Sequence, residues 1–403
     1  MSSPATDKSV RYFSAPGRVE IGGNHTDHQH GRVLAAAVGL EITASVTRWD
    51  SVRQGDDSSA WLRKAAETIR LVTEVPALKT ALHSSDILVD LGKLEVDPAE
   101  KGTAAALVRG VAAWFVEHGY PIGGFDAALS SSIPIGAGLS SSAAFAVLVG
   151  NIFKGLFGGD VSLMEIAKAG KYAENVYFGK PCGLMDQAAS SYGGLNVIDF
   201  ADPEMPVVTP VRADLSGYSM CVVNTGGSHA DLTPDYAAAT KEMRAVATHF
   251  GKDFLSEICS DEFFSSVHKL RYLGDRANLR AIHFFADNER VLKQAAALES
   301  GDMKAFLQLV IDSGRSSLAY LQNVYSPENP QQQGLTLALA LSEKILEGTG
   351  AWRVHGGGFA GTILAFVPDE LNAEYERCMC AVFGNDSCHF LNIRNEGGRE
   401  DRV

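Results

Sequence analysis

The sequence lacks the features of a secreted, membrane-spanning or nucleic-acid-binding protein. The first ten residues are polar and have no apolar signal core, and no run of about 18 apolar residues occurs anywhere. Basic residues are few, since 35 Lys and Arg stand against 48 Asp and Glu and give a net charge of −13. Such a chain is not expected to bind nucleic acid or membranes, and a cytoplasmic location is the default expectation.

Cysteine is also scarce for a chain of 403 residues. The six cysteines do not suggest a disulfide framework, and Cys378 and Cys380 have no second pair at the spacing of a zinc ribbon. We therefore expect reduced cysteines with mostly structural roles. The hydrophobic fraction of 46% and the charged fraction of 21% predict a large buried core.

A chain of this length is expected to divide into two or three domains. A change in composition near 203–216 sets the boundary, so we expect domains at 1–205 and 206–403. Residue alternation and flanking turn signals predict strands at 33–46, 124–130, 194–200, 218–224 and 362–367. Helical periodicity predicts helices at 60–72, 103–118, 143–157, 162–178 and 369–382, with most of 235–349 helical as well.

A glycine- and serine-rich loop precedes the apolar helix expected at 143–157. Gly136 and Gly138 let backbone N–H groups approach a ligand, and a helix N-terminus carries partial positive charge, so the loop suits phosphate. The loop has no lysine, which excludes a Walker loop, and Ser141 stands where the dinucleotide fingerprint needs glycine. The alternative is a serine-rich helix cap beside a tight turn, and the loop alone does not decide between the two.

A polar loop follows the first strand-like segment. Its Arg18, His25 and Asp27 are candidates to converge on the hydroxyl groups of a small molecule, whereas most polar loops are solvated hairpins. A metal cluster built from its histidines and Asp27 is a third alternative, but the ligand spacing of known sites is missing.

Two carboxylates lie near expected helix ends. Asp186 lies near a helix start, where it either complements the helix dipole or accepts a proton from a substrate hydroxyl. Glu174 comes late in its helix, where the dipole does not stabilise a carboxylate, which favours a partner such as a metal ion. The glycine-rich segment 353–361 either forms a tight turn or, beside the serine loop, lets two backbones close around phosphates.

Three separated segments resemble the GHMP kinases and, among these, the galactokinases. The segments are Pro16-Gly-Arg-Val19 with Asn24-His-Thr-Asp27, Pro134-Ile-Gly-Ala-Gly-Leu-Ser-Ser-Ser-Ala143, and Gly356-Gly-Gly-Phe-Ala-Gly361. Cys182-Gly-Leu-Met-Asp-Gln187 and the Arg280-Ala-Ile-His283 region also resemble galactokinase elements. Their order and spacing match the family over the whole chain.

The resemblance implies a two-domain GHMP kinase fold of the α+β class, with the active site in the cleft between the domains. The N-terminal domain would be ribosomal-protein-S5-like, and the C-terminal domain a ferredoxin-like α+β unit. The implied reaction transfers the γ-phosphoryl group of ATP, with Mg2+, to the anomeric hydroxyl of galactose. The implied partners are thus a sugar and ATP; the sequence does not define the oligomeric state, and a monomer is the default expectation.

The resemblance also assigns roles to individual residues. Asp186 and Arg18 match the catalytic positions. Asp186 either takes the proton of the anomeric hydroxyl or acts only electrostatically, and Arg18 keeps it ionised and screens charge that develops on the transferring group. Ser142 and Glu174 match the magnesium ligands. The residues that match the phosphate loop are Pro134, Gly136, Ala137, Gly138, Leu139, Ser140, Ser141 and Ser142. The residues that match sugar-contacting positions are Asn24, His25, Asp27, Gly183 and Tyr236.

Asn24 departs from the family pattern. Galactokinases usually show Gly-Glu-His-Thr-Asp-Tyr where this chain has Gly23-Asn-His-Thr-Asp-His28, so an amide replaces an acidic sugar ligand. A carboxylate would repel a uronic acid and an amide can donate a hydrogen bond to one, and the Asp27-His-Gln29 run resembles the galacturonate kinases of plants. Galacturonate is therefore an alternative substrate, and Asn24→Glu is expected to shift preference toward galactose.

A different class of function is a galactokinase-like sensor that binds sugar and ATP without turnover. That outcome usually accompanies damage to the serine loop or to the base, and both are intact in this sequence. A mevalonate- or homoserine-type kinase is disfavoured, because those relatives lack the first sugar motif together with the Cys182–Asp186 segment.

Overall fold

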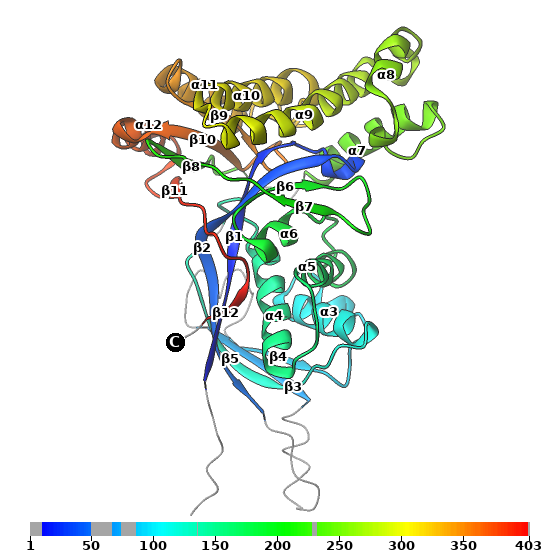
Figure 1. Cartoon of the computed structure of the whole chain (residues 1–403), viewed down its shortest axis with the longest axis vertical. Coiled ribbons are helices and arrows are strands. Elements are labelled where there is room, and N and C mark those ends of the chain that lie inside the picture. The colour runs from blue at the N-terminus through cyan, green and yellow to red at the C-terminus, as the bar shows by residue number, and fades with distance from the viewer. Residues whose placement is uncertain (1–9, 50–66, 74–85, 135, 228–231, 402–403) are drawn as a thin grey trace, which may run out of the picture.

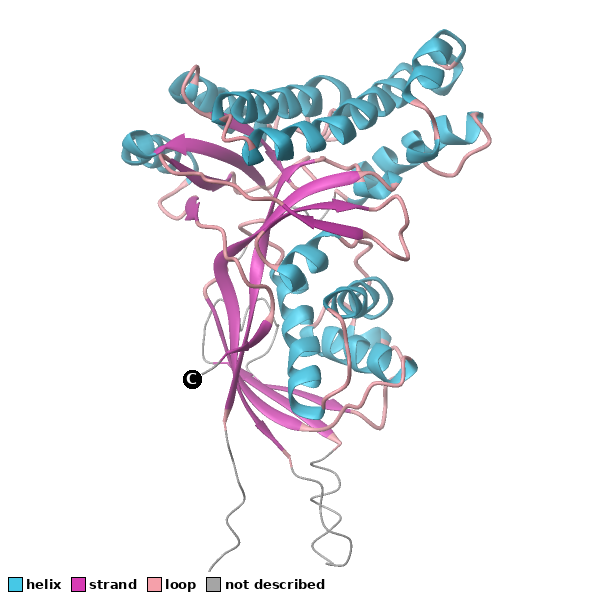
Figure 2. Cartoon of the chain, viewed as in Figure 1, coloured by secondary structure: helices cyan, strands magenta, loops and turns pink. Residues whose placement is uncertain are grey.

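The structure, a computed structural model, describes residues 10–49, 67–73, 86–134, 136–227 and 232–401. These residues form two sheets with helices packed against them (Figure 1 and Figure 2). The larger sheet has eight strands in the order β12-β1-β2-β5-β3-β4, with β6 paired to β2 and β7 paired to β6. The smaller sheet has four strands in the order β11-β8-β10-β9. This mixed architecture confirms the predicted α+β class.

The strands are β1 (Arg11–Gly22), β2 (Arg32–Arg48), β3 (Thr68–Thr73), β4 (Asp86–Asp90), β5 (Phe125–Ser131), β6 (Leu195–Asp199), β7 (Val207–Pro210), β8 (Tyr218–Asn224), β9 (Ala351–His355), β10 (Thr362–Pro368), β11 (Cys388–Leu391) and β12 (Arg399–Asp401). The α-helices are α3 (Ala104–Glu117), α4 (Ser141–Phe157), α5 (Leu163–Tyr172), α6 (Met185–Tyr192), α7 (Thr233–His249), α8 (Ser260–Ser266), α9 (Asp275–Glu299), α10 (Met303–Ser316), α11 (Gly334–Leu346) and α12 (Asn372–Phe383). None of the helices among the described residues is both long and apolar enough to cross a membrane.

The long strands β1 and β2 connect the part of the molecule around α3 and α4 with the layer of helices at the opposite end (Figure 1). They pair antiparallel, as the alternating residues of 33–46 predict. Their register shifts between Pro16 and Arg18 and again between Glu20 and Gly22. Such irregularities re-aim side chains, so the first polar motif departs from a regular strand where its functional residues begin.

Helix α4 is the central helix of the larger layer. Its residues are apolar on nearly every side, so it packs between β1 and the helices α3, α5 and α6. Ser140 precedes it in left-handed backbone, with φ of 54°. The serine loop therefore ends where a buried helix begins, as the sequence predicts.

A π-helix at Ala173–Phe178 continues α5 and ends at Gly179, where φ is 79°. A π-turn inserts an extra residue per turn and often marks a functional site. It carries Glu174, which is fully buried. After the predicted Pro-Cys-Gly break, α6 begins at Met185 and has Asp186 in its first turn.

One secondary-structure prediction is wrong. The helix expected at 60–72 overlaps β3, which pairs parallel to β5 and antiparallel to β4; residues 60–66 lie outside the described part of the chain. Alternate residues of β3 are buried, which is the period of a strand. The sequence before β3 is rich in Ala, which favours a helix, and the predicted helix extends into the strand.

Segments of the second half of the chain also enter the larger sheet. β7 pairs with β6, and β12 pairs with β1 at the opposite edge. The boundary at 205/206 stays a prediction about folding units. The observed topology means that the C-terminal strand ties the second half of the chain to the first.

Candidate active site

Arg18 and Asp186 form the central ion pair of the site. Nε of Arg18 donates to Oδ1 of Asp186 at 2.6 Å, and the hydroxyl of Ser140 donates to Oδ2 at 2.5 Å. Burial alone would raise the pKa of Asp186, but Arg18, Lys180 and the Ser140 hydrogen bond lower it to about 2. Asp186 is therefore a carboxylate at neutral pH. The structure thus brings together the two residues predicted to be catalytic.

The same arginine also fixes the serine loop. Nη1 of Arg18 donates to the carbonyl of Gly138 at 2.6 Å, and its backbone N–H donates to the carbonyl of Leu139 at 3.1 Å. Gly136 and Gly138 have φ of 73° and 69°, a region that favours glycine. The side chain of Ser140 does not cap α4, so the first N–H groups of the helix lack that partner. The loop has the geometry of an anion site.

Glu174 lies beside the start of α4. Its Oε1 accepts a hydrogen bond from the hydroxyl of Ser142 and is 3.7 Å from Nζ of Lys180. Its Oε2 accepts from Nε2 of Gln187 and from the thiol of Cys182, which is 3.3 Å away. Burial lowers the pKa of Lys180, but Glu174, Asp186 and Cys182 together outweigh burial and the net shift is upward, so Lys180 is cationic. The hydrogen bonds from Gln187 and Cys182 thus fix the orientation of the Glu174 carboxylate.

Ser142 and Glu174 fit a magnesium ion. Both offer oxygen atoms, which are the ligands that Mg2+ prefers, and they already lie in contact. Among the described residues, no group of three or more His, Cys, Asp and Glu side chains could hold a metal by themselves. Such a sparse ligand set suits a magnesium ion that arrives with the phosphates of ATP.

The residues expected to contact a sugar form two neighbouring groups. In the first, Oδ2 of Asp27 faces Gly183 so closely that a Cβ at residue 183 would lie 2.1 Å from it. In the second, Nε2 of His25 lies 2.8 Å from the carbonyl of Gly357, and the His25 ring stacks on Tyr236 with centroids 6.3 Å apart. Burial lowers the pKa of His25 to about 3, so it is neutral. A side chain at position 183 would therefore displace the Asp27 carboxylate.

Asn24 is the exception among these residues, and the structure corrects the expectation that it contacts a sugar. It is fully buried, and its Nδ2 donates to Oε1 of Glu20 at 3.0 Å and to the carbonyl of Gly356 at 2.6 Å. Its Oδ1 accepts from Ser317 at 3.1 Å and from Asn323 at 2.8 Å. The amide is saturated by protein partners, so it has no donor left for a sugar.

Glu20, the acidic residue that accepts a hydrogen bond from Asn24, was not identified from the sequence. Oε1 of Glu20 also accepts from Nη2 of Arg353 at 2.7 Å, and both side chains are buried. Burial raises the pKa of Glu20 to about 7, although the charge of Arg353 opposes the rise. An acidic residue between Val19 and Ile21 in a buried strand was the available signal for such a partner.

His355 was also missed, and it joins the serine loop to the smaller sheet. Its Nε2 accepts from the backbone N–H of Glu20 at 3.2 Å, and its Nδ1 lies 2.9 Å from the hydroxyl of Thr362. A Cβ at Gly138 would lie 2.5 Å from that same hydroxyl. The ends of β9 and β10, rather than the glycine-rich loop between them, therefore face the phosphate loop. The glycine-rich loop instead contacts His25 and Asn24.

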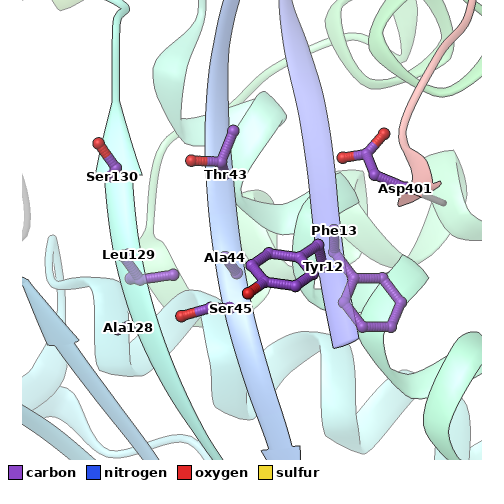
Figure 3. A pocket seen from close by; sticks show the side chains of 9 residues that line it. All are labelled: Tyr12, Phe13, Thr43, Ala44, Ser45, Ala128, Leu129, Ser130 and Asp401. Atoms are coloured by element: carbon purple, nitrogen blue, oxygen red, sulfur yellow. The ribbon is translucent and has the colours of Figure 1, made fainter. Parts of the chain in front are cut away.

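A separate hollow of about 580 Å³ lies on the larger sheet, over β1, β2 and β5 (Figure 3). Tyr12, Thr43, Ser45, Ser130 and Asp401 contribute its polar side chains. No Lys or Arg is among the described residues that line it. The candidate active site lies elsewhere, at the serine loop.

Known proteins match the chain in sequence and in structure. The family model of the GHMP kinases N terminal domain matches residues 106–194, and the galactokinase galactose-binding signature matches residues 5–48. Galactokinase of Actinobacillus pleuropneumoniae is 30% identical over 357 residues, which cover 88% of this chain and 85% of that protein. Galactokinase of Glaesserella parasuis serovar 5 matches with the same identity and coverage.

Two solved structures share the fold. Lactococcus lactis galactokinase complexed with galactose has a TM-score of 0.79 at 23% identity, covering 98% of this chain and 96% of that one. Mevalonate kinase of L. major in complex with R-mevalonate has a TM-score of 0.62 at 13% identity, covering 98% and 100%.

The fold, with a serine loop at the start of α4 beside an Arg–Asp pair, defines a GHMP kinase, an ATP-using enzyme that phosphorylates an alcohol group. Within that class, 30% identity over most of both chains identifies the family. The chain belongs to the galactokinase family.

The burial of Asn24 changes what its substitution should do. Asn24→Glu would place a second carboxylate beside Glu20 and remove the donor to Gly356, so we expect a loss of about 3 kcal/mol in the free energy of unfolding. The double variant Glu20→Gln, Asn24→Glu restores a single carboxylate and should recover much of that loss. Urea unfolding of the three proteins measures both effects. Wild-type stability in Asn24→Glu would contradict the assignment.

Glu20 also predicts a pH dependence of stability. Its pKa rises from 4.5 to about 7 on folding, so its contribution is fully present below pH 4.5 and is lost as pH rises through 7. Glu20→Gln removes this dependence, so its stability relative to wild type should improve by roughly 3 kcal/mol between pH 4.5 and 8. Unfolding at both pH values tests this, with Glu370→Gln on the exposed surface as the control. A constant difference between variant and wild type would contradict it.

Proposed function

We propose that this kinase transfers the γ-phosphoryl group of ATP to the anomeric hydroxyl of galactose. The observation that carries the proposal is the Arg18–Asp186 pair, which contacts both the phosphate loop and the start of α6. The galactose-binding signature over residues 5–48 and the curated galactokinase relatives support the choice of sugar.

Asp186 is suited to accept a proton late in the reaction. Its pKa of about 2 makes it a weak base for a free hydroxyl. Phosphoryl transfer proceeds through a loose transition state that needs little help from a strong base, because bond breaking to the leaving group runs ahead. Asp186 therefore orients the hydroxyl by accepting its hydrogen bond and takes the proton as the new P–O bond forms. This account combines the proton-acceptor and electrostatic roles.

The serine loop and α4 are suited to hold the triphosphate. The N–H groups at the helix start and the open backbone at Gly136 and Gly138 would donate to phosphate oxygens. Ser142 and Glu174 would hold the magnesium ion. When bound, that ion would neutralise charge on the β- and γ-phosphates.

The sugar would lie between Asp186 and the pair formed by His25 and Tyr236. Asp27 can accept hydrogen bonds from adjacent hydroxyls, with Gly183 leaving the space for it. The neutral ring of His25 donates to Gly357 through Nε2, which leaves Nδ1 as an acceptor. The amide of Asn24 donates to protein groups, so it has no donor left for the carboxylate of galacturonate.

The first experiment is release of ADP with ATP and magnesium across galactose, galacturonate, glucose, N-acetylgalactosamine and arabinose. We expect galactose to give the highest kcat/KM, with phosphate at C1 in the product. Preference for galacturonate would reject galactose as the substrate. Binding of sugar and ATP without turnover would instead support the sensor.

Asp186→Asn should lower kcat by about 10³-fold while sugar affinity changes little, because the amide still accepts a hydrogen bond but cannot take the proton. Steady-state kinetics and calorimetry of galactose binding provide the two measurements. Asp199→Asn, which also breaks an Arg–Asp pair, is the matched control and should leave kcat unchanged. Equal kcat in Asp186→Asn and wild type would exclude the assigned role.

Gly183→Ala should weaken sugar binding at least about tenfold, since the new Cβ would force Asp27 away from its position. The affinity for ATP should stay within twofold of wild type. Gly39→Ala is the matched control, because a Cβ there meets nothing nearer than 3.8 Å. Calorimetric titration with galactose decides, and unchanged affinity would show that Asp27 does not bind the sugar.

A further inference from the structure

Lys180 lies beside Glu174, one of the two carboxylates that the proposed reaction uses. Its Nζ is 3.7 Å from Oε1 of Glu174, the oxygen that also contacts Ser142. Its charge acts on Asp186 as well. The side chain of Lys180 is 50% exposed, whereas Glu174 is fully buried. The proposed function gives this cation no contact with a substrate.

The backbone around Lys180 is held at defined points. The N–H of Lys180 donates to the carbonyl of Glu174 at 3.0 Å, and the side chain of Asn175 accepts from the N–H of Cys182 at 2.7 Å. Gly179 closes the π-helix before it, and Gly183 packs on Asp27 after it. The segment therefore directs Lys180 into the site from a fixed position.

The other nearby cation is partly engaged. Arg18 already donates from Nε to Asp186 and from Nη1 to the carbonyl of Gly138. In a chain with a net charge of −13, charge developing on a phosphoryl group must be balanced locally. Lys180, whose side chain is half exposed beside Glu174, is a second cation that can supply this charge.

We propose that Lys180 is a further catalytic residue, whose ammonium group binds the phosphoryl group during its transfer. This inference rests on the proposed function. In the proposed function, the acceptor hydroxyl binds at Asp186 and the phosphates bind near Ser142 and Glu174. Lys180 contacts Glu174 and its charge acts on Asp186, so its ammonium group is within reach of a phosphoryl group that moves from one to the other.

The step balances without a proton from lysine. A bond forms between O1 of the sugar and the γ-phosphorus, and the bond from that phosphorus to the bridging oxygen of ADP breaks. The proton of the hydroxyl passes to Asp186 and then to water. Lys180 keeps its protons and donates hydrogen bonds to the equatorial oxygens, where the charge is spread.

The test compares Lys180→Met and Lys180→Arg with wild type at saturating galactose, ATP and Mg2+. We expect Lys180→Met to lower kcat about 10²-fold with KM for galactose within twofold, and Lys180→Arg to recover part of the rate. The matched control is Lys101→Met, because the stem of Lys101 packs over Gly179, next to Lys180. This control should keep the wild-type kcat.

A second measurement does not depend on turnover. ADP with aluminium fluoride, Mg2+ and galactose imitates the transferring group, and its stabilising shift in melting temperature should be smaller in Lys180→Met than in wild type. Unchanged kcat, together with a lower Mg2+ concentration for half-maximal activity, would overturn the proposal, since Lys180 would then only neutralise Glu174. Wild-type protein without turnover on any sugar would reject the proposed function itself and this inference with it.

Discussion

The bond network of Arg18 is the constraint on which the rest of the site depends. The guanidinium of Arg18 donates to Asp186 and to a carbonyl of the serine loop, and the hydroxyl of Ser140 donates to the same carboxylate. These contacts connect β1, the loop before α4 and the start of α6, three elements far apart in the sequence. In the proposed function, this network therefore fixes the position of the sugar hydroxyl relative to ATP. Phosphoryl transfer requires such positioning.

A second network, centred on Asn24, helps to join the two sheets. Its amide connects Glu20 on β1 with the glycine-rich loop after β9, and its backbone N–H donates to Asp287 on α9 at 2.8 Å. The glycine-rich loop also accepts hydrogen bonds from His25 and Tyr236. Asn24 therefore helps to shape the proposed sugar side of the site, although it is itself fully buried. Buried polar groups that are fully paired act in this way, by specifying one arrangement.

Local pattern predicted the strand–loop–helix around Ser140, and the resemblance to the galactokinases predicted the α+β class and the pairing of Arg18 with Asp186. The direction of a side chain within an irregular strand is not local. Asn24 and Asp27 look alike in the motif, yet Asn24 points to Ser317 and Asn323 from distant elements while Asp27 faces Gly183. Apolar and polar residues alternate in β3, as in a strand, but the Ala-rich sequence before it favoured a helix. The segment was therefore predicted as a helix.

The two buried carboxylates of the site show how one fold sets opposite charge states. Asp186 receives Arg18 and Ser140 directly with Lys180 nearby, and its pKa falls to about 2. Glu20 is more deeply buried, and its partner Arg353 also donates to the carbonyls of Ile21 and Val354, so burial outweighs that charge and raises the pKa to about 7. The direction of each shift therefore depends on whether the neighbouring charges and donors outweigh burial. In the proposed function, an ionised carboxylate thus lies beside the reacting hydroxyl, and a carboxylate that titrates near neutrality lies at the junction of the sheets.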